Sequence, residues 1–472
     1  MNKLPDIKTN FPEWYQEVIY AAQLADQAPV RGCIVIRPYG NAIWENIKKR
    51  LDDRIKATGH ENAIFPLFIP QSFLSKEAEH VEGFAPELAV VTHAGGKELE
   101  EPLVVRPTSE TMIHHMFAKW IRSWRDLPLK INQWANVVRW EKRPRAFLRT
   151  TEFFWQEGHT AHATKQEALE ETLMMLGEYV DLAQNYLAIP VITGRKTPHE
   201  KFPGAEATYT FEAFLTDGKA LQMGTSHLLS QSFAHAFEMK FQDKDGTVVY
   251  PYLTSWGATT RLVGAVVGSH GDDRGLIMPP KIAPIQVVIV PILKKDSQEV
   301  VLDYVHKLTQ ELKEAGIAVK LDADDAASPG AKFYEWELKG VPLRFEIGAR
   351  DIASGIVVAV SRLGKEKETV PATNMAAWTT AKLDDIQAAL FKRAQDRYAA
   401  MWHKSESLVE FRDELQKNNG IYQVGWCQDH ACEAKLKEIA ASIRCMVDSK
   451  ELQKCFECGK PSLGDVIVGR AY

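Results

Sequence analysis

The stretch RWEKRPRAFLRTTEFFWQEGHT, residues 139–160, alternates arginines, aromatic side chains and carboxylates. Arg139 and Glu141 are two residues apart, so on a strand they would share a face. Pro144 favours a turn between them and a returning strand. One face of that strand would carry Thr151, Phe153, Trp155, Glu157 and His159, and the other Glu152, Phe154 and Gln156. Taken alone, the pattern equally fits an ordinary hairpin with a solvated basic tip.

The chain around this segment has the composition of a globular protein of several domains. It has 472 residues, a formal net charge of −5, 45% hydrophobic and 25% charged residues. This length allows two to four domains, and the acidic balance restricts any nucleic-acid binding to local basic surfaces. No apolar run has the length of a signal peptide core or a membrane span, which predicts a cytoplasmic protein.

Two changes of pattern predict three domains. Residues 1–283 mix a helix over 166–187 with consecutive strands in IPVITGRK, ATYTFEAFLT and KALQMGTS, which favours an antiparallel sheet. After the proline cluster MPPKIAPIQ (278–286), strands alternate with helices at 297–315, around AKFYEWELKG and near 383–402. We therefore predict an α+β domain over 1–283, an α/β domain over 284–402 and a small α/β domain over 403–472.

Five of the six cysteines lie in the last 46 residues. The pairs Cys427/Cys432 and Cys455/Cys458 have spacings that suit tetrahedral Zn²⁺, and four thiolates would leave no open position, so the zinc would be structural. Cys445 lies in IRCMV, which is typical of a buried strand, and is left outside the site. The alternative is a group of buried cysteines without a metal.

Three further stretches of the first domain carry candidate site residues. VVRPTSET (104–111) would place Thr108 and Glu110 on one face if it is extended. LQMGTSH (221–227) and SWGATTRLVGAVVGSHGDDRGLIMPP (255–280) add polar residues, among them Arg261 in a Gly-rich apolar segment. A guanidinium there needs an anionic partner, either a phosphate or a carboxylate in a buried salt bridge.

Taken in order, these motifs resemble class II aminoacyl-tRNA synthetases. RWE, the basic loop and RTTEFFWQEGHTAH are similar to their motif 2, GATTRLVGAVVGSHGDDRGLIMPP to motif 3, and FPLFIPQSFL (65–74) to the motif 1 dimer-interface segment. Together with RPTSE and LQMGTSHLL, they resemble prolyl-tRNA synthetases of the archaeal/eukaryotic type over essentially the whole chain. The resemblance implies a class II antiparallel sheet with flanking helices, an α/β anticodon-binding domain and a zinc-containing C-terminal domain.

The resemblance also implies a reaction, with ATP, L-proline and tRNA(Pro) as partners and Mg²⁺ accompanying the phosphates. ATP and proline would form prolyl-adenylate and pyrophosphate, and proline would then pass to the 3′ end of the tRNA. Arg139 and Arg261 match the catalytic arginines. The implied ATP contacts are Arg139, Glu141, Arg149, Phe153, Gln222, Thr225, Thr259 and Arg261.

Proline offers a secondary ammonium and an apolar ring. Thr108 and Glu110 form a suitable acceptor pair for the two N–H groups, and Glu110 supplies the opposite charge. The implied proline contacts are Thr108, Glu110, Arg139, Phe84, Trp155, Glu157, His159, Phe202 and His227. Without the resemblance, Phe84 and Phe202 would be interpreted as ordinary core residues.

In the second domain, YEWELKGVPLRFEIGARD matches the segment that contacts the anticodon in this family. Glu337 and Arg344 would bind guanine edges and Arg350 the backbone, although all three also fit solvated surface charges. The resemblance further implies a homodimer.

About a hundred residues separate His159 from Gly257, and the catalytic sheet accounts for them, so we expect no cis-editing domain. Mischarged alanine would then require a separate trans-acting enzyme. Two alternatives to a charging enzyme stay open at this point. One is a class II paralogue that has lost tRNA charging, and the other is a non-catalytic RNA- or protein-binding scaffold.

Overall fold

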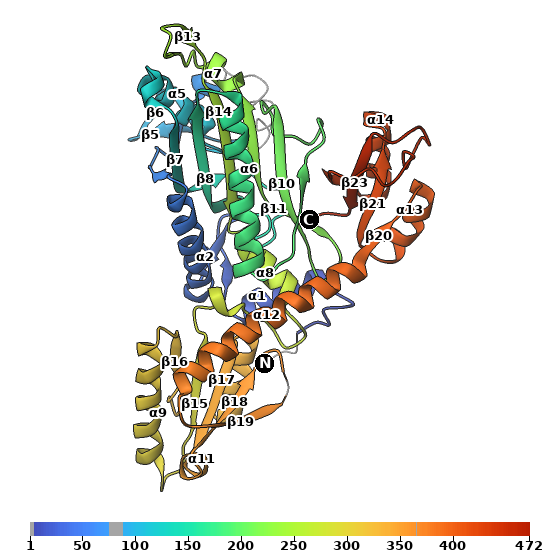
Figure 1. Ribbon diagram of the computed structural model, residues 1–472. Helices are drawn as coiled ribbons and strands as arrows, with labels where there is room; N and C mark the ends of the chain where they lie inside the picture. Colours follow the sequence, from blue (N-terminus) through green and yellow to red (C-terminus); the bar gives the residue numbers. More distant parts are fainter. Residues whose placement is uncertain (1–3, 75–87, 365) are drawn as a thin grey trace.

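The computed structural model describes residues 4–74, 88–364 and 366–472 (Figure 1). A large α+β unit carries a smaller α/β unit at one end and a third unit at its side, and the long helix α12 (Met375–Met401) runs between the last two. Each unit has its own buried apolar cluster. The predicted fold class is confirmed, and among the described residues no helix is both long and apolar enough to span a membrane.

An antiparallel sheet forms the centre of the first unit. Its strands follow the order β9-β10-β11-β14-β8-β7, with β3 added at the far edge by a parallel pair. Each neighbouring pair from β9 to β7 is antiparallel, as the consecutive strand patterns predict. The bounds are β3 Glu61–Asn62, β7 Leu129–Val138, β8 Glu152–His162, β9 Ile192–Arg195, β10 Ala207–Phe214, β11 Ala220–Ser230 and β14 Tyr252–Thr259.

Helix α6 (Lys165–Asp181) lies along one face of this sheet (Figure 1). Thr164 begins it with a capping box in which the hydroxyl accepts from the Glu167 N–H, and a π-helical turn at Leu182–Tyr186 continues it. Its buried side chains pack on Phe211 and Trp256 of the sheet. The same cluster includes side chains of α1 (Phe11–Ala21), α2 (Pro38–Ala57) and α8 (Arg261–His270).

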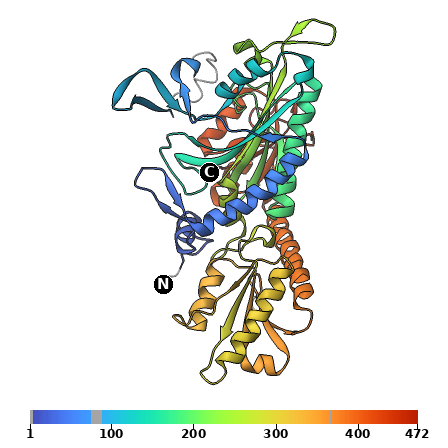
Figure 2. The same ribbon diagram turned by 90° about the vertical axis from the view of Figure 1, so that its left-hand side faces the viewer.

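Smaller elements surround the sheet. In Figure 2 the β5–β6 hairpin (Ala89–Ala94 and Lys97–Val105) projects from the first unit, and β4 (Phe68–Pro70) pairs with β6. The others are β1 Ala25–Gln27, β2 Ile34–Ile36, α3 Gln71–Leu74, α5 Glu110–Trp120, α7 Ser232–Ala236, β12 Phe241–Gln242 and β13 Val248–Val249, with 3₁₀ turns at Trp124–Asp126 and Pro280–Ile282.

Two local expectations about extended chain were wrong. Strand β7 ends at Val138, so Arg139 and Glu141 lie in the loop beyond it, although the Arg139 N–H still donates to the Thr151 carbonyl at 2.8 Å. Thr108 and Glu110 do not lie on a strand either, because Glu110 begins α5. Their side chains meet nonetheless, since the turn into the helix brings the Thr108 hydroxyl to the Glu110 carboxylate.

The second unit is a five-stranded sheet of order β16-β15-β17-β18-β19. β15 pairs in parallel with β16 and β17, and the β17–β18–β19 pairs are antiparallel. The elements are β15 Val287–Ile292, α9 Gln298–Glu314, β16 Val319–Leu321, α10 Pro329–Leu338, β17 Leu343–Gly348, α11 Ala349–Ala353, β18 Ile356–Ser361 and β19 Lys367–Pro371. The final helix is longer than the predicted 383–402, because α12 begins at Met375.

The third unit extends the sheet of the first. Strands β20-β21-β23-β22 continue the order into β9 through the pair Met446–Arg195. Their bounds are β20 Trp402–Lys404, α13 Leu408–Lys417, β21 Ile421–Trp426, α14 His430–Ala434, β22 Ser442–Met446 and β23 Gly464–Gly469, with a 3₁₀ turn at Lys435–Ile439. As predicted, Cys445 is buried in a strand. The continuous sheet was not predicted, because the edge pairing joins segments some 250 residues apart.

Candidate active site

A cavity of about 400 Å³ opens on one face of the large sheet, and α6 packs on the other face, where Tyr179 contacts Gln156 and Phe211. Every predicted ATP or proline contact that the structure describes lines it, and Phe84 lies outside the described residues. Those residues are Thr108, Glu110, Arg139, Glu141, Arg149, Phe153, Trp155, Glu157, His159, Phe202, Gln222, Thr225, His227, Thr259 and Arg261. They come from five separate segments, at 108–110, 139–159, 202, 222–227 and 259–261, so the fold assembles one site from scattered motifs.

Strand alternation explains much of this convergence. Phe153, Trp155, Glu157 and His159 face the cavity from β8, as their period of two predicts. Across the ladder, β14 places Gly257 opposite Glu157. If residue 224 on β11 had a Cβ atom, that atom would lie 2.6 Å from the Gly257 carbonyl oxygen. Only glycine at position 224 therefore allows β11 and β14 to approach this closely.

Three arginines give one part of the cavity a strong positive charge. Arg261 is held by hydrogen bonds from its guanidinium to the Leu148 carbonyl at 3.0 Å and the Gln222 carbonyl at 2.9 Å. Among the described residues no carboxylate pairs with it, so the structure does not show the buried salt bridge that the sequence also allowed. Burial, together with the charges of Arg149 and Arg139, lowers the pKa of Arg261 to about 10. The guanidinium therefore stays charged at pH 7.

The other two arginines lie beside aromatic and acidic groups. Arg139 donates to the Pro107 carbonyl at 2.9 Å, and its guanidinium lies 5.4 Å and 5.5 Å from the ring centres of Phe153 and Trp155. Arg149 pairs with Glu141 at 3.3 Å. An anionic ligand would thus meet guanidinium groups that are already oriented by neighbouring contacts.

A network of buried carboxylates occupies another part of the cavity. The Thr108 hydroxyl donates to Glu110, and Glu157 accepts from Ser109 at 2.5 Å and Gln133 at 2.6 Å. His159 lies 3.1 Å from the second oxygen of Glu157. These contacts fix the carboxylates beside the arginines, as recognition of a ligand with both a carboxylate and an ammonium group requires.

A neutral histidine forms an apolar wall with Phe202. Burial lowers the pKa of His227 to about 4, so its imidazole is uncharged at pH 7. Both ring nitrogens are engaged, Nδ1 with Thr208 at 3.0 Å and Nε2 with Thr225 at 3.0 Å. The Phe202 ring stacks on the imidazole with centroids 4.5 Å apart. This wall suits a small aliphatic ring.

Comparisons with known proteins place each part of the chain in a family. The tRNA synthetase class II core domain (G, H, P, S and T) matches residues 91–270, an anticodon binding domain matches 286–382, and the prolyl-tRNA synthetase C-terminal domain matches 408–472. The chain is similar to "Proline--tRNA ligase 2" of Clostridioides difficile strain 630, with 48% identity over 100% of this chain and 98% of the relative. It is also similar to "Proline--tRNA ligase" of Chlorobium phaeobacteroides strain BS1 (50%; 98% and 98%) and of Cytophaga hutchinsonii (50%; 99% and 99%).

The chain belongs to the proline–tRNA ligase family. It therefore has a class II catalytic core, an anticodon-binding domain and the C-terminal domain of this family, and it is an enzyme of the ligase class.

Some residues that shape this ligase site were not predicted. Ser109 and Gln133 hold Glu157, and Thr208 lies opposite His227 on the β10–β11 ladder. Cross-strand partners such as Thr208 depend on register, which one sequence does not reveal. The sequence does contain one relevant pattern: in ATYTFE, Thr208 and Thr210 alternate with apolar residues, which would place both hydroxyls on one face of a strand.

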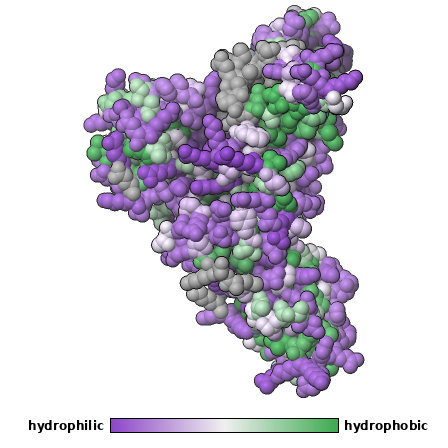
Figure 3. All heavy atoms as spheres, turned by 180° about the vertical axis from the view of Figure 1, so that it is seen from behind, coloured by the Kyte–Doolittle hydropathy of each residue, from purple (hydrophilic) through white to green (hydrophobic). Residues whose placement is uncertain are grey.

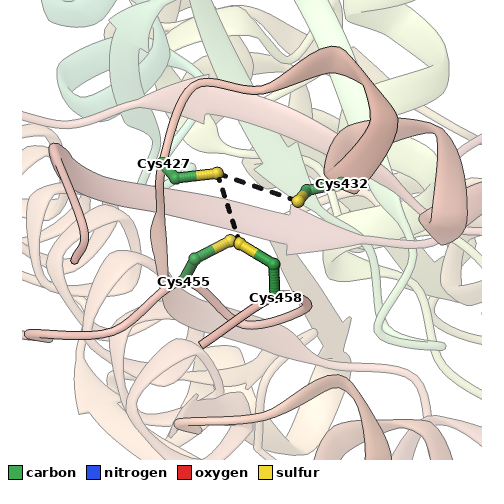
Figure 4. A group of neighbouring side chains, drawn as sticks. All are labelled: Cys427, Cys432, Cys455 and Cys458. Carbon is green, nitrogen blue, oxygen red and sulfur yellow. Dashed lines mark hydrogen bonds between the residues drawn. The ribbon is translucent and has the colours of Figure 1, made fainter. Parts of the chain in front are cut away.

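The four predicted zinc ligands meet in the C-terminal domain of the ligase (Figure 4). Cys427 Sγ lies 3.7 Å from Cys432 Sγ and 3.7 Å from Cys458 Sγ. Four sulfurs around Zn²⁺ at about 2.3 Å would be about 3.8 Å apart, so the spacing fits the metal. A hydrogen bond from the Lys460 backbone lowers the pKa of Cys458 to about 7, whereas burial raises the pKa of Cys427 and of Cys432. Of these three thiols, only Cys458 is favoured as the thiolate that binds zinc.

The predicted anticodon contacts are arranged less uniformly. Glu337 and Arg344 line one cavity of about 130 Å³, where Glu337 pairs with Arg274 at 2.5 Å and Arg344 with Glu346 at 2.9 Å. Arg350 does not line this cavity and is exposed on α11. To bind Glu337 or Arg344, an anticodon base would therefore have to replace the ion pair that each of these side chains already makes.

Proposed function

We propose that this protein activates L-proline with ATP and transfers it to the 3′ end of tRNA(Pro). The single observation that carries the proposal is the shared cavity, which is lined by three arginines, by the carboxylates of Glu110 and Glu157 and by the apolar wall of Phe202 and His227. In the first half-reaction a proline carboxylate oxygen attacks the α-phosphorus. Prolyl-adenylate forms and the bond to pyrophosphate breaks.

The arginines would act on the charges that develop in this step. Arg139 would bridge the proline carboxylate and the α-phosphate, and Arg261 and Arg149 would bind the remaining phosphates. Glu141 would accept from the adenine amino group and Phe153 would stack on the base. Gln222, Thr225 and Thr259 complete the proposed ATP contacts, all of them on the cavity wall.

The carboxylate network would bind the proline ammonium. Glu110 supplies the opposite charge and Thr108 a second acceptor. Glu157 and His159, which contact each other, would line the bottom of the proline pocket. The ring would lie against Trp155, Phe202 and the neutral His227. Phe84 is proposed from the family resemblance alone.

Two metals accompany the proposal. Mg²⁺ would enter with ATP and neutralise phosphate charge, held mainly by phosphate oxygens. Zn²⁺ would be held by Cys427, Cys432, Cys455 and Cys458, whose sulfur spacing supports a closed structural site. Glu337, Arg344 and Arg350 would read the anticodon of tRNA(Pro).

Other parts of the proposal concern organisation. We place the domain boundaries at 283/284 and 402/403, between the separate apolar clusters. Residues 163–251 form α6, α7 and strands β9–β13 of the catalytic unit, which supports the absence of a cis-editing domain and a need for trans-editing of mischarged alanine.

We also propose, from the family resemblance, that the protein is a homodimer that acts in the cytoplasm. The exposed apolar side chains of Ile64, Phe68 and Val90, near motif 1, support the dimer. Figure 3 shows apolar patches on the otherwise hydrophilic rear face.

The proposal is tested by ATP–pyrophosphate exchange with the purified chain and a panel of amino acids, followed by charging of tRNA(Pro). We expect the rate of exchange with proline to be far above the rate with any other amino acid, and we expect the protein to charge tRNA(Pro) with proline. Exchange without charging would identify a paralogue that has lost tRNA transfer. No exchange by the folded protein would favour a non-catalytic scaffold.

Replacing Phe202 with alanine should raise KM for proline about 10- to 100-fold with a smaller change in KM for ATP, because the ring wall loses apolar contact. Steady-state exchange at varied proline measures this. Phe154→Ala is the matched control, since Phe154 is 46% exposed on the other face of β8. Equal effects of the two variants would contradict the assignment.

Replacing Cys432 with serine should remove one equivalent of zinc per chain and lower the melting temperature, because Cys432 is also part of the apolar cluster of the C-terminal domain. Elemental analysis and calorimetry measure both effects. Cys33→Ser, outside the cluster, should retain the metal. Undiminished zinc in Cys432→Ser would exclude this site.

A further inference from the structure

A second group of metal-ligating side chains lies between the catalytic and C-terminal domains. It consists of His199, from the loop after β9, with His430 and Glu433 of α14. One donor atom from each lies within 4.8 Å of the others, and the group shares no residue with the four cysteines. Neither the ATP and proline site nor the structural zinc site accounts for it.

The two imidazoles are in direct contact across the domain boundary. The ring centroids of His199 and His430 are 3.7 Å apart with an interplanar angle of 38°. Both histidines are exposed, so an ion could reach them from solvent. Two adjacent imidazoles offer nitrogen donors of the kind that zinc and its neighbours in the first transition row prefer.

The Glu433 carboxylate supplies an independent observation that points to a cation at this position. Its side chain is only 9% exposed. One carboxylate oxygen accepts from the Thr197 hydroxyl at 2.7 Å, whereas Oε2 is buried with no hydrogen-bond partner and lies 3.8 Å from His430 Nδ1. An unsatisfied buried carboxylate oxygen is costly, and a cation between Oε2 and the imidazoles would remove that cost.

We propose that His199, His430 and Glu433 bind a divalent transition-metal ion, with Zn²⁺ as the best match to two imidazoles and a carboxylate. Tetrahedral ligands at about 2.1 Å from zinc lie about 3.4 Å apart, so donors that are up to 4.8 Å apart need to approach by up to about 1.4 Å. Rotation of the two exposed histidine rings can provide this movement, while Thr197 keeps the carboxylate in place. Water would complete the coordination.

The position of the site gives the ion a structural role. The loop that carries His199 also supplies Lys196, Glu200, Lys201, Phe202 and Pro203 to the wall of the active-site cavity. Its contacts with the C-terminal domain include the Thr197–Glu433 hydrogen bond, the His199–His430 ring contact and the ion pairs that Lys196 and Arg444 make with Glu212. A metal bond from His199 to His430 and Glu433 would fasten the exposed part of this loop to the same domain.

The test is a Zn²⁺ titration of the full-length protein that already carries one equivalent in its cysteine site. Competition with a chromophoric chelator and elemental analysis after gel filtration count the ions. We expect a second equivalent in the wild-type protein. In His199→Ala and in Glu433→Gln it should bind at least about 10-fold more weakly, with the first equivalent retained. His306→Ala, an exposed histidine of α9, is the matched control and should bind two.

Hydrogen exchange of residues 196–206 provides a readout that does not depend on activity. The second equivalent should slow exchange there in the wild-type protein and leave it unchanged in His199→Ala. A wild-type protein that binds only one equivalent, or a His199→Ala protein that binds two as tightly, would overturn the site. Binding without slower exchange would overturn the fastening of the loop.

Discussion

Replacing Arg261 with alanine is expected to lower kcat/KM for proline-dependent ATP–pyrophosphate exchange by about 10³-fold, equivalent to about 4 kcal/mol of transition-state stabilisation. The guanidinium is buried, already oriented by the Leu148 and Gln222 carbonyls, and without a carboxylate partner among the described residues. Its charge is therefore available to a phosphate in a site of low dielectric constant. Exchange kinetics at varied ATP and proline measure the loss.

The control for this prediction separates charge from geometry. Arg261→Lys should recover only part of the activity, because an ammonium group cannot bind two oxygens in a plane. The alanine variant also leaves two backbone carbonyls without their donors, so its thermal unfolding and circular dichroism must be compared with the wild type. A folded Arg261→Ala protein with undiminished exchange would remove Arg261 from the catalytic site.

Replacing Glu212 with alanine is expected to lower the free energy of unfolding by about 3–5 kcal/mol. Glu212 is fully buried on β10 and accepts from Lys196 at 2.8 Å and from Arg444 at 2.9 Å. Its removal would leave two largely buried cations without a counterion. Because Arg444 belongs to β22, the same change should loosen the C-terminal domain from the catalytic sheet.

Denaturant unfolding measures this loss, and the pH dependence gives a second test. Burial alone would raise the pKa of Glu212, but the charges of Lys196 and Arg444 outweigh it and lower the pKa below 4.5. Its contribution to stability is therefore present above pH 4.5 and is lost as the pH falls through the lower folded-state pKa. Glu212→Gln should show less of this acid sensitivity.

The exposed pair Lys307–Asp303 provides the matched control for a salt bridge in water. Asp303→Ala should change stability by less than about 1 kcal/mol, since both side chains are more than half exposed. A Glu212→Ala protein as stable as Asp303→Ala would mean that the three buried charges do not hold the domains together.

Features that repeat along the chain could be predicted from the sequence. The period of two in residues 153–159 predicted the cavity face of β8, whereas Thr151, predicted on the same face, precedes the strand and does not line the cavity. Spaced apolar residues predicted α6. The cysteine spacing predicted a cluster whose sulfurs meet. These patterns are local, so each can be recognised without knowing how distant segments pair.

Features that depend on where a strand stops or on its partner could not be predicted in this way. β7 ends one residue before Arg139, and α5 begins at Glu110, so neither predicted pair lies on a strand. The contact of Thr208 with His227 depends on the register of β10 and β11. The contact of His199 with His430 depends on how two domains pack, and the two residues are more than 200 positions apart in the sequence.

The union of β22 with β9 has a consequence for how the protein is made. The ribosome synthesises the ATP-binding strands long before residues 442–469. The β9 edge of the nascent sheet is therefore unpaired, because its neighbour β22 belongs to the nearly half of the chain that is not yet synthesised. An uncovered edge strand pairs readily with another chain. Premature termination after α12 should therefore yield a polypeptide that aggregates during translation, even though it contains every residue of the ATP and proline cavity.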